Sequence, residues 1–142
     1  CPESRGLGDV YKRQGYTYIE PQAYLTCWVA LTDTDEENGC PWVMPGLHQR
    51  GTLFHDSTDL GHEIPLDASE AIPLPLKAGS IAIFSSLTPH RTGPNLSEGI
   101  RKSYILQYAP EGSKRVISQS LAEDLNDETR QFLILKDGKE VN

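Results

Sequence analysis

His90 is the residue of this 142-residue chain whose surroundings point most clearly to chemistry. It stands at the end of an expected strand, just before a loop, and Thr92 and Arg101 follow it within eleven residues. Between residues 77 and 102 four cations oppose a single carboxylate, so a small anion would prefer this stretch. A single histidine beside a loop is usually only solvated, so its interpretation depends on the sequence around it.

Other polar residues have simpler explanations. Ser85 and Ser86 lie near His90, as a nucleophile and its base would, but the chain has no G-x-S-x-G elbow and loop serines are common. We therefore do not expect a hydrolase. Asn38-Gly39 is the commonest pair of residues in tight turns, so a structural role explains it best.

The cysteines and the remaining histidines do not predict a metal centre. Three cysteines, none in a C-x-x-C pair, favour reduced and mostly buried thiols over a disulfide or a zinc site. His55 and His62, with acidic neighbours, could bind an adventitious metal, but a solvated acidic loop is the interpretation that we favour. The cysteines are Cys1, Cys27 and Cys40.

The segment 23–32 is expected to form the central strand that positions these residues. It is rich in aromatic and β-branched side chains and ends in the turn-forming run 33–39. Alternate residues of a strand share a face. One face should be plain core, and the other, apolar but with hydroxyls, resembles a cavity wall. The first set is Leu25, Cys27, Val29 and Leu31; the second is Tyr24, Thr26, Trp28 and Ala30.

The other elements are read from apolar runs and from Gly/Pro turns. Short strands joined by such turns indicate a mainly β sandwich or barrel. A long polar loop is expected over 47–70, a second loop over 88–99 and a short helix with an acidic face over 120–130. Further strands are expected at 40–44, 71–76 (an edge strand, because of its prolines), 80–84 and 100–109, with a terminal hairpin at 131–141 around Asp137-Gly138.

Composition limits the functional class. The net charge of -7 would repel nucleic acid and anionic membranes, and no apolar run approaches the ~20 residues of a membrane span. We expect a soluble, cytoplasmic protein. Residues 33–70 hold nine acidic residues and one basic residue, so a strongly anionic substrate would approach elsewhere.

Three ordered blocks, 25–33, 37–48 and 86–108, resemble the phytanoyl-CoA dioxygenase family of iron(II)- and 2-oxoglutarate-dependent oxygenases. The resemblance covers about residues 15–109. It implies a double-stranded β-helix, or jelly roll, that holds Fe(II) in a mouth between its two sheets. It also implies that 2-oxoglutarate and O2 are consumed in hydroxylating a small organic substrate.

The resemblance assigns roles to residues at matching positions. His90 is similar to the second histidine of the facial triad of iron ligands, and neutral imidazole suits iron(II). Arg101 is similar to the arginine that clamps the distal carboxylate of 2-oxoglutarate, and Thr92 to the hydroxyl that assists it. Trp28 either packs along this cosubstrate or is plain core. His48 either faces the substrate or stabilises its own turn.

One departure from the family pattern stands out. The facial triad also needs a His-x-Asp pair, and no His-x-Asp or His-x-Glu occurs in the chain. By position the pair should fall at residues 11–13, which are Tyr-Lys-Arg. Because residues 8–14 resemble a translated sequencing-library adapter, of the kind found on metagenomic or transcript fragments, we expect residues 1–14 to be foreign. Residues 15–142 would then be the C-terminal part of a jelly-roll domain, incomplete at its N-terminus.

The departure leaves two functional hypotheses. In the first, the chain is an inactive fragment of an iron(II)/2-oxoglutarate dioxygenase. In the second, a natural protein without the iron ligands serves as a metal-free binding or sensor module that keeps an anion pocket at Arg101 and Thr92.

Overall fold

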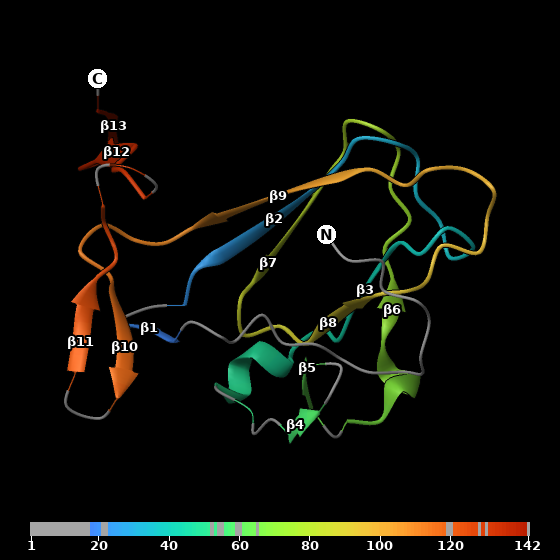
Figure 1. The fold of residues 1–142 in the computed structure, drawn as a ribbon, viewed down its shortest axis with the longest axis horizontal. Helices are drawn as coiled ribbons and strands as arrows, with labels where there is room; N and C mark the ends of the chain where they lie inside the picture. Colours follow the sequence, from blue (N-terminus) through green and yellow to red (C-terminus); the bar gives the residue numbers. More distant parts are fainter. Residues whose placement is uncertain are drawn as a thin grey trace.

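Two antiparallel three-stranded sheets form the centre of the structure (Figure 1). In the first, β2 (Leu25–Ala30) lies between β7 (Ile81–Ser85) and β9 (Ser103–Tyr108). In the second, β3 (Pro41–Val43) lies between β6 (Ile72–Pro73) and β8 (His90–Thr92). The structure is a computed structural model that describes residues 18–20, 23–51, 53, 56–58, 61–64, 66–118, 121–127, 129 and 131–141.

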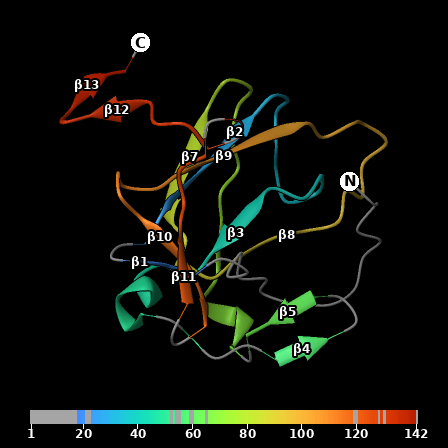
Figure 2. The same cartoon turned by 60° about the vertical axis from the view of Figure 1, so that its left-hand side comes forward.

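Smaller elements surround these sheets. A third sheet joins β1 (Tyr18–Glu20), β10 (Lys114–Ser118) and β11 (Leu121–Asp124), and the hairpin of β12 (Leu135–Lys136) and β13 (Lys139–Glu140) extends away from the centre in both views (Figures 1 and 2). The remaining elements are the 3-10 helices η1 (Leu47–Arg50) and η2 (Ala68–Glu70) and the hairpin of β4 (Asp56–Thr58) and β5 (Gly61–Glu63).

The core lies on the opposite face of β2 from the one expected. Tyr24, Thr26, Trp28 and Ala30 are at most 5% exposed, whereas Leu25 is 48% and Leu31 54% exposed. The prediction that the leucine face is plain core is therefore wrong, although Cys27 on that face is buried. The physical reason is that Leu74 and Leu76, which follow β6, pack against Trp28 and Ala30. The interior therefore lies on the side of β2 that Leu74 and Leu76 cover.

Several predicted elements are confirmed and several are corrected. The strands expected at 23–32, 40–44, 71–76, 80–84 and 100–109 are present as β2, β3, β6, β7 and β9, with β6 at a sheet edge. The terminal hairpin is confirmed, and Asp137 and Gly138 both have positive φ, as its tight turn requires. The loop expected over 47–70 is wrong in part, since it contains η1, β4, β5 and η2. The loop expected over 88–99 contains β8.

The helix expected over 120–130 is wrong, because β11 occupies residues 121–124. The acidic residues that suggested the exposed face of a helix instead pair with basic residues of the neighbouring strand β10. Arg115 Nη2 lies 2.7 Å from Glu123 Oε2, and Lys114 Nζ lies 4.0 Å from Asp124 Oδ1. These pairs join residues that face each other across the β10–β11 ladder, where opposite charges favour pairing.

Two further expectations concern thiols and membranes. Cys27 and Cys40 are free and buried, as expected, whereas Cys1 lies outside the described residues. Among the residues that the structure describes, no helix is long and apolar enough to span a bilayer.

Asp33 ties the end of β2 to the turn before β7. Its carboxylate accepts hydrogen bonds from Lys77 Nζ and from Ala78 N, both at 2.8 Å. The hydrogen bond from Lys77 is the main cause that lowers the pKa of Asp33 below its ordinary value. A carboxyl whose pKa is lower in the folded state contributes stability above its unfolded pKa and loses it as the pH falls through the folded pKa.

We therefore expect Asp33→Asn to lower the urea midpoint of unfolding slightly at pH 7 and to leave it unchanged at pH values well below about 4. The effect is small because both side chains of the pair are exposed and screened by solvent. Urea titrations of both proteins across this pH range test the expectation, and Lys77→Gln should reproduce the loss at pH 7. Parallel pH profiles for wild type and Asp33→Asn would contradict it.

Candidate active site

His90 is held at the start of β8 in a form that suits a metal ligand. Its Nδ1 lies 2.8 Å from the carbonyl oxygen of Thr88, and its ring packs against Phe84 with centroids 4.7 Å apart. Burial is the main cause that lowers the pKa of His90, so the imidazole is neutral at neutral pH. With Nδ1–H donating to Thr88, Nε2 carries the lone pair that a metal ion requires.

Arg101, just before β9, is anchored by three backbone carbonyls. Its Nη1 donates to the oxygens of Asn38 at 3.3 Å, Gly93 at 3.2 Å and Gly39. All the hydrogen bonds seen from this guanidinium to described residues leave from Nη1. The half-buried side chain therefore keeps Nε and Nη2 as a planar pair of donors, which matches the two oxygens of a carboxylate.

Gly39 makes this anchoring possible. Its φ of +85° is rare for residues with a side chain, and a Cβ at this position would overlap Arg101 Nη1 and Gly93 O and lie 2.8 Å from Pro94 O. The predicted turn role of Asn38-Gly39 is consistent with the hydrogen bonds between Asn38 N and Asp35 Oδ1 at 2.9 Å and between Asp35 N and Asn38 Oδ1 at 3.0 Å. The turn thus also presents two of its carbonyls to Arg101, which sequence reasoning missed.

The pairing of β3 with β8 sets the relation of His90 to Arg101. Val43 pairs with His90 at one end of this short ladder and Pro41 with Thr92 at the other, and the anchor of Arg101 follows directly beyond it. The three residue steps of extended chain from His90 to Gly93 span about 10 Å. The candidate metal ligand and the candidate anion clamp therefore lie at the two ends of one ladder. Among the described residues, His90 bonds to Thr88, whereas Arg101 bonds to Asn38, Gly39 and Gly93.

Thr92 and Trp28 are placed differently. Thr92 lies on the same face of β8 as His90, two residues on, and its side chain is exposed. Trp28 is 4% exposed and belongs to the cluster that Phe84 joins, so it is part of the core. Its contact with a cosubstrate and the carboxylate role of Thr92 stay predictions.

Thr26 belongs to the strand face that the sequence predicts to be a cavity wall, but sequence reasoning gave it no role of its own. It is 1% exposed, and its Oγ1 has no hydrogen-bond partner within the described part of the chain. Alternation along β2 places it on the buried face, but only the structure shows that its hydroxyl is unsatisfied.

The other histidines do not join His90. His48 is exposed on η1, where its carbonyl accepts a hydrogen bond of 3.2 Å from Gly51 N, so its backbone does stabilise the turn, and its contact with substrate stays a prediction. His62 lies in β5, and His55 falls outside the described residues, as do residues 11–13. Within the described ranges no group of three His, Cys, Asp or Glu side chains could hold a metal ion.

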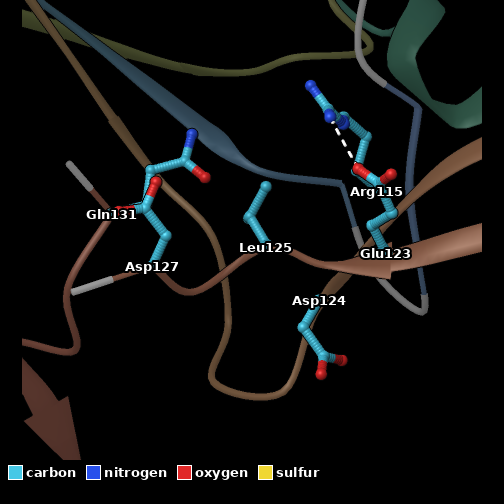
Figure 3. Close-up of a pocket in the computed structure, with 6 residues that line it drawn as sticks. All are labelled: Arg115, Glu123, Asp124, Leu125, Asp127 and Gln131. Carbon is cyan, nitrogen blue, oxygen red and sulfur yellow. Dashed lines mark hydrogen bonds and ion pairs between the residues drawn. The ribbon is translucent and has the colours of Figure 1, made fainter. Parts of the chain in front are cut away.

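A polar pocket of about 340 Å³ lies away from these residues, beside the β10–β11 hairpin (Figure 3). The ion pair of Arg115 and Glu123 occupies one side of it, and Asp127 Oδ1 accepts hydrogen bonds from Thr129 N at 2.7 Å and Oγ1 at 2.6 Å. Its charged groups thus have partners within the chain, and it is not part of the candidate active site. The lining residues are Arg115, Glu123, Asp124, Leu125, Asp127 and Gln131.

Comparisons with known proteins identify the family of this chain. Over 85 residues the chain is 34% identical to the methylphosphonate hydroxylase of Gimesia maris, which covers 60% of this chain and 33% of the relative. Over 98 residues it is 32% identical to phytanoyl-CoA dioxygenase 1 of Oryza sativa subsp. japonica, which covers 63% of this chain and 35% of the relative. The chain therefore spans about a third of the length of these relatives.

Solved structures confirm the predicted fold. EvdO2 of Micromonospora carbonacea var. aurantiaca, crystallised with 2-oxoglutarate, superposes with a TM-score of 0.60 at 27% identity, covering 72% of this chain and 42% of EvdO2. The jelly roll of the non-haem iron and 2-oxoglutarate oxygenases is thus the fold of this chain. The model of the family described as phytanoyl-CoA dioxygenase (PhyH) matches residues 9–103, and the chain belongs to that family.

Proposed function

We propose that this chain provides the 2-oxoglutarate site and one iron ligand of a dioxygenase that hydroxylates a small organic substrate. The observation that carries the proposal is the ladder of β3 and β8, with a neutral imidazole at one end and a carbonyl-anchored guanidinium at the other. The distance between the two ends of this ladder is similar to the distance from a metal ion to the far carboxylate of a five-carbon dicarboxylate bound to it.

His90 fits the iron of this family as one ligand. Its Nε2 lone pair is available because Nδ1–H donates to Thr88 O at 2.8 Å, and the contact with Phe84 fixes the plane of the ring. When bound, the iron would activate O2 and couple the oxidative decarboxylation of 2-oxoglutarate to hydroxylation of the substrate. His90 itself only holds the metal and stays neutral.

Arg101 binds the distal carboxylate of 2-oxoglutarate in this proposal. Two parallel hydrogen bonds from Nε and Nη2 would hold the carboxylate in one orientation, while Nη1 keeps the guanidinium against Gly39 and Gly93. Thr92 assists from the end of β8, and Trp28 supplies an apolar wall that excludes water. His48, exposed on η1, is the residue that we propose to face the substrate.

In this proposal the remaining iron ligands come from outside residues 15–142, because this stretch holds no His-x-Asp. With one ligand of three, the 142-residue chain should bind Fe(II) weakly and produce no succinate. The alternative is a metal-free binding module. It is supported by the absence of His-x-Asp and by the anion clamp at Arg101, which is anchored by backbone carbonyls and needs no metal.

The test is to titrate the purified chain with 2-oxoglutarate and with pyruvate, which has the 2-oxo acid but lacks the distal carboxylate, and to follow the ligands by NMR. We expect 2-oxoglutarate to bind at least tenfold more tightly than pyruvate, since only it reaches Arg101. A modest further gain with Fe(II), lost in His90→Ala, would favour the oxygenase over the metal-free module.

Two outcomes would contradict the proposal. Equal binding of the two acids would remove the role of the clamp. Succinate formation by the 142-residue chain at a rate typical of an intact oxygenase would show that it holds the other iron ligands after all.

A further inference from the structure

The hydroxyl of Thr26 is buried and has no hydrogen-bond partner among the described residues. The residue is 1% exposed, and its Oγ1 makes no hydrogen bond to any described residue. Burying a hydroxyl without a partner costs free energy, so native proteins pair such groups with protein, water or ligand.

A second buried threonine, Thr34, shows the usual solution. Thr34 is 4% exposed, and its Oγ1 donates to Leu76 O at 3.4 Å and accepts from Leu76 N at 3.2 Å. Thr34 thus joins the turn after β2 to the segment after β6, whereas the hydroxyl of Thr26 makes no such bond. The contrast indicates that the partner of Thr26 is not part of the described chain.

The surroundings of Thr26 show where such a partner would lie. Tyr24 and Trp28 share its face of β2, and both are at most 5% exposed. Phe84 of β7 pairs directly with Thr26, and facing side chains on one side of a sheet are in contact. The ring of Phe84 in turn packs on His90, with ring centroids 4.7 Å apart.

Thr26 is therefore on the His90 side of the interior. Arg101 is on the other side, because Ser103, two residues after it, pairs with Ala30 at the far end of β2. The four residue steps from Thr26 to Ala30 extend over about 13 Å. A ligand held by Arg101 at one end would meet Thr26 only with its opposite, metal-binding end.

We propose that the Thr26 hydroxyl donates a hydrogen bond to the 2-oxo oxygen at the metal-binding end of bound 2-oxoglutarate. That end offers only acceptor oxygens, and a threonine hydroxyl is a donor that needs no ionisation. This inference rests on the proposed function and adds a second polar contact to the clamp at Arg101. Trp28 and Phe84 exclude water from the same interior, which strengthens the hydrogen bond.

The test combines ligand-free stability with ligand binding in Thr26→Val, Thr26→Ser and the matched control Thr34→Val. Without ligand, Thr26→Val should unfold at a temperature equal to or a few degrees above that of wild type, since it removes an unsatisfied hydroxyl. Thr34→Val should unfold a few degrees lower, since it breaks the bonds to Leu76.

Binding should show the opposite order. Thr26→Val should bind 2-oxoglutarate about tenfold more weakly than wild type and should bind glutarate, which lacks the 2-oxo group, with unchanged affinity. Thr26→Ser keeps the hydroxyl and should retain most of the affinity for 2-oxoglutarate, and Thr34→Val should leave both affinities unchanged.

Three results would overturn the inference. A loss of ligand-free stability in Thr26→Val would show that the hydroxyl has a structural partner, and undiminished binding of 2-oxoglutarate would show that it does not contact the ligand. An equal loss for both ligands would place the contact away from the 2-oxo group. If wild type binds 2-oxoglutarate no better than pyruvate, the proposed function itself fails. If wild type binds 2-oxoglutarate more tightly than pyruvate and Thr26→Val does not weaken this binding, only the present inference fails.

Discussion

Replacing Arg101 with lysine is expected to weaken the binding of 2-oxoglutarate by about a hundredfold. A hundredfold loss is about 2.7 kcal/mol, within the range for a lost hydrogen bond between charged groups. Lysine keeps the charge but not the planar fork, so it could not hold both carboxylate oxygens while also bonding to the carbonyls of Gly39 and Gly93. Calorimetric or NMR titration of the variant with 2-oxoglutarate measures the effect.

The neighbouring Lys102 provides the control. It is an exposed cation one residue away, and its backbone N–H, which bonds to Thr32 Oγ1 at 3.0 Å, is unaffected by a change of side chain. Lys102→Ala should change the affinity less than twofold. If Lys102→Ala and Arg101→Lys weakened binding equally, the basic stretch would act through its general field and not through a clamp.

The central sheet could be predicted from sequence because its strands are locally distinct. The segment that forms β2 has aromatic and β-branched residues and ends in a turn, and the prolines of β6 keep it at an edge. β8 was missed because His-Arg-Thr lacks an apolar pattern. It is a strand only because β3 pairs with it, and that partner lies more than forty residues earlier.

The choice between the two faces of β2 could not be made from sequence. Both faces are largely apolar, and the covering residues Leu74 and Leu76 come from a distant segment. The acidic pattern of β11 was ambiguous for a similar reason. Its carboxylates fit a helix surface, but they also fit the cations of β10, and only the hairpin shows which partner they have.

The candidate site divides in the same way. His90, Thr92 and Arg101 could be proposed from their order and spacing, because all three lie in one of the blocks that carry the family resemblance, residues 86–108. The hydrogen bonds that anchor Arg101 could not be predicted from sequence, since the carbonyls of Asn38 and Gly39 lie 63 and 62 residues away in sequence. Whether the hydroxyl of Thr26 is satisfied likewise depends on strands that only the fold brings together.

Gly39→Ala is expected to disrupt both the fold around Arg101 and the binding of 2-oxoglutarate. An alanine at φ +85° adds backbone strain of about 1–2 kcal/mol. Its Cβ would also displace Arg101 Nη1 or the backbone carbonyls of Gly93 and Pro94. We expect a total loss of about 3 kcal/mol in the free energy of unfolding and at least a tenfold loss in affinity.

Gly79→Ala separates the two causes. Gly79 has a nearly identical φ of +88°, but a Cβ there would meet nothing within 4 Å. This control should therefore show the backbone strain alone, with a loss of about 1–2 kcal/mol and unchanged binding of 2-oxoglutarate. Chemical denaturation gives the first quantity and ligand titration the second. Equal losses of stability in the two variants, with binding retained in both, would mean that Arg101 does not depend on the close approach of Gly39, and its clamp would need another anchor.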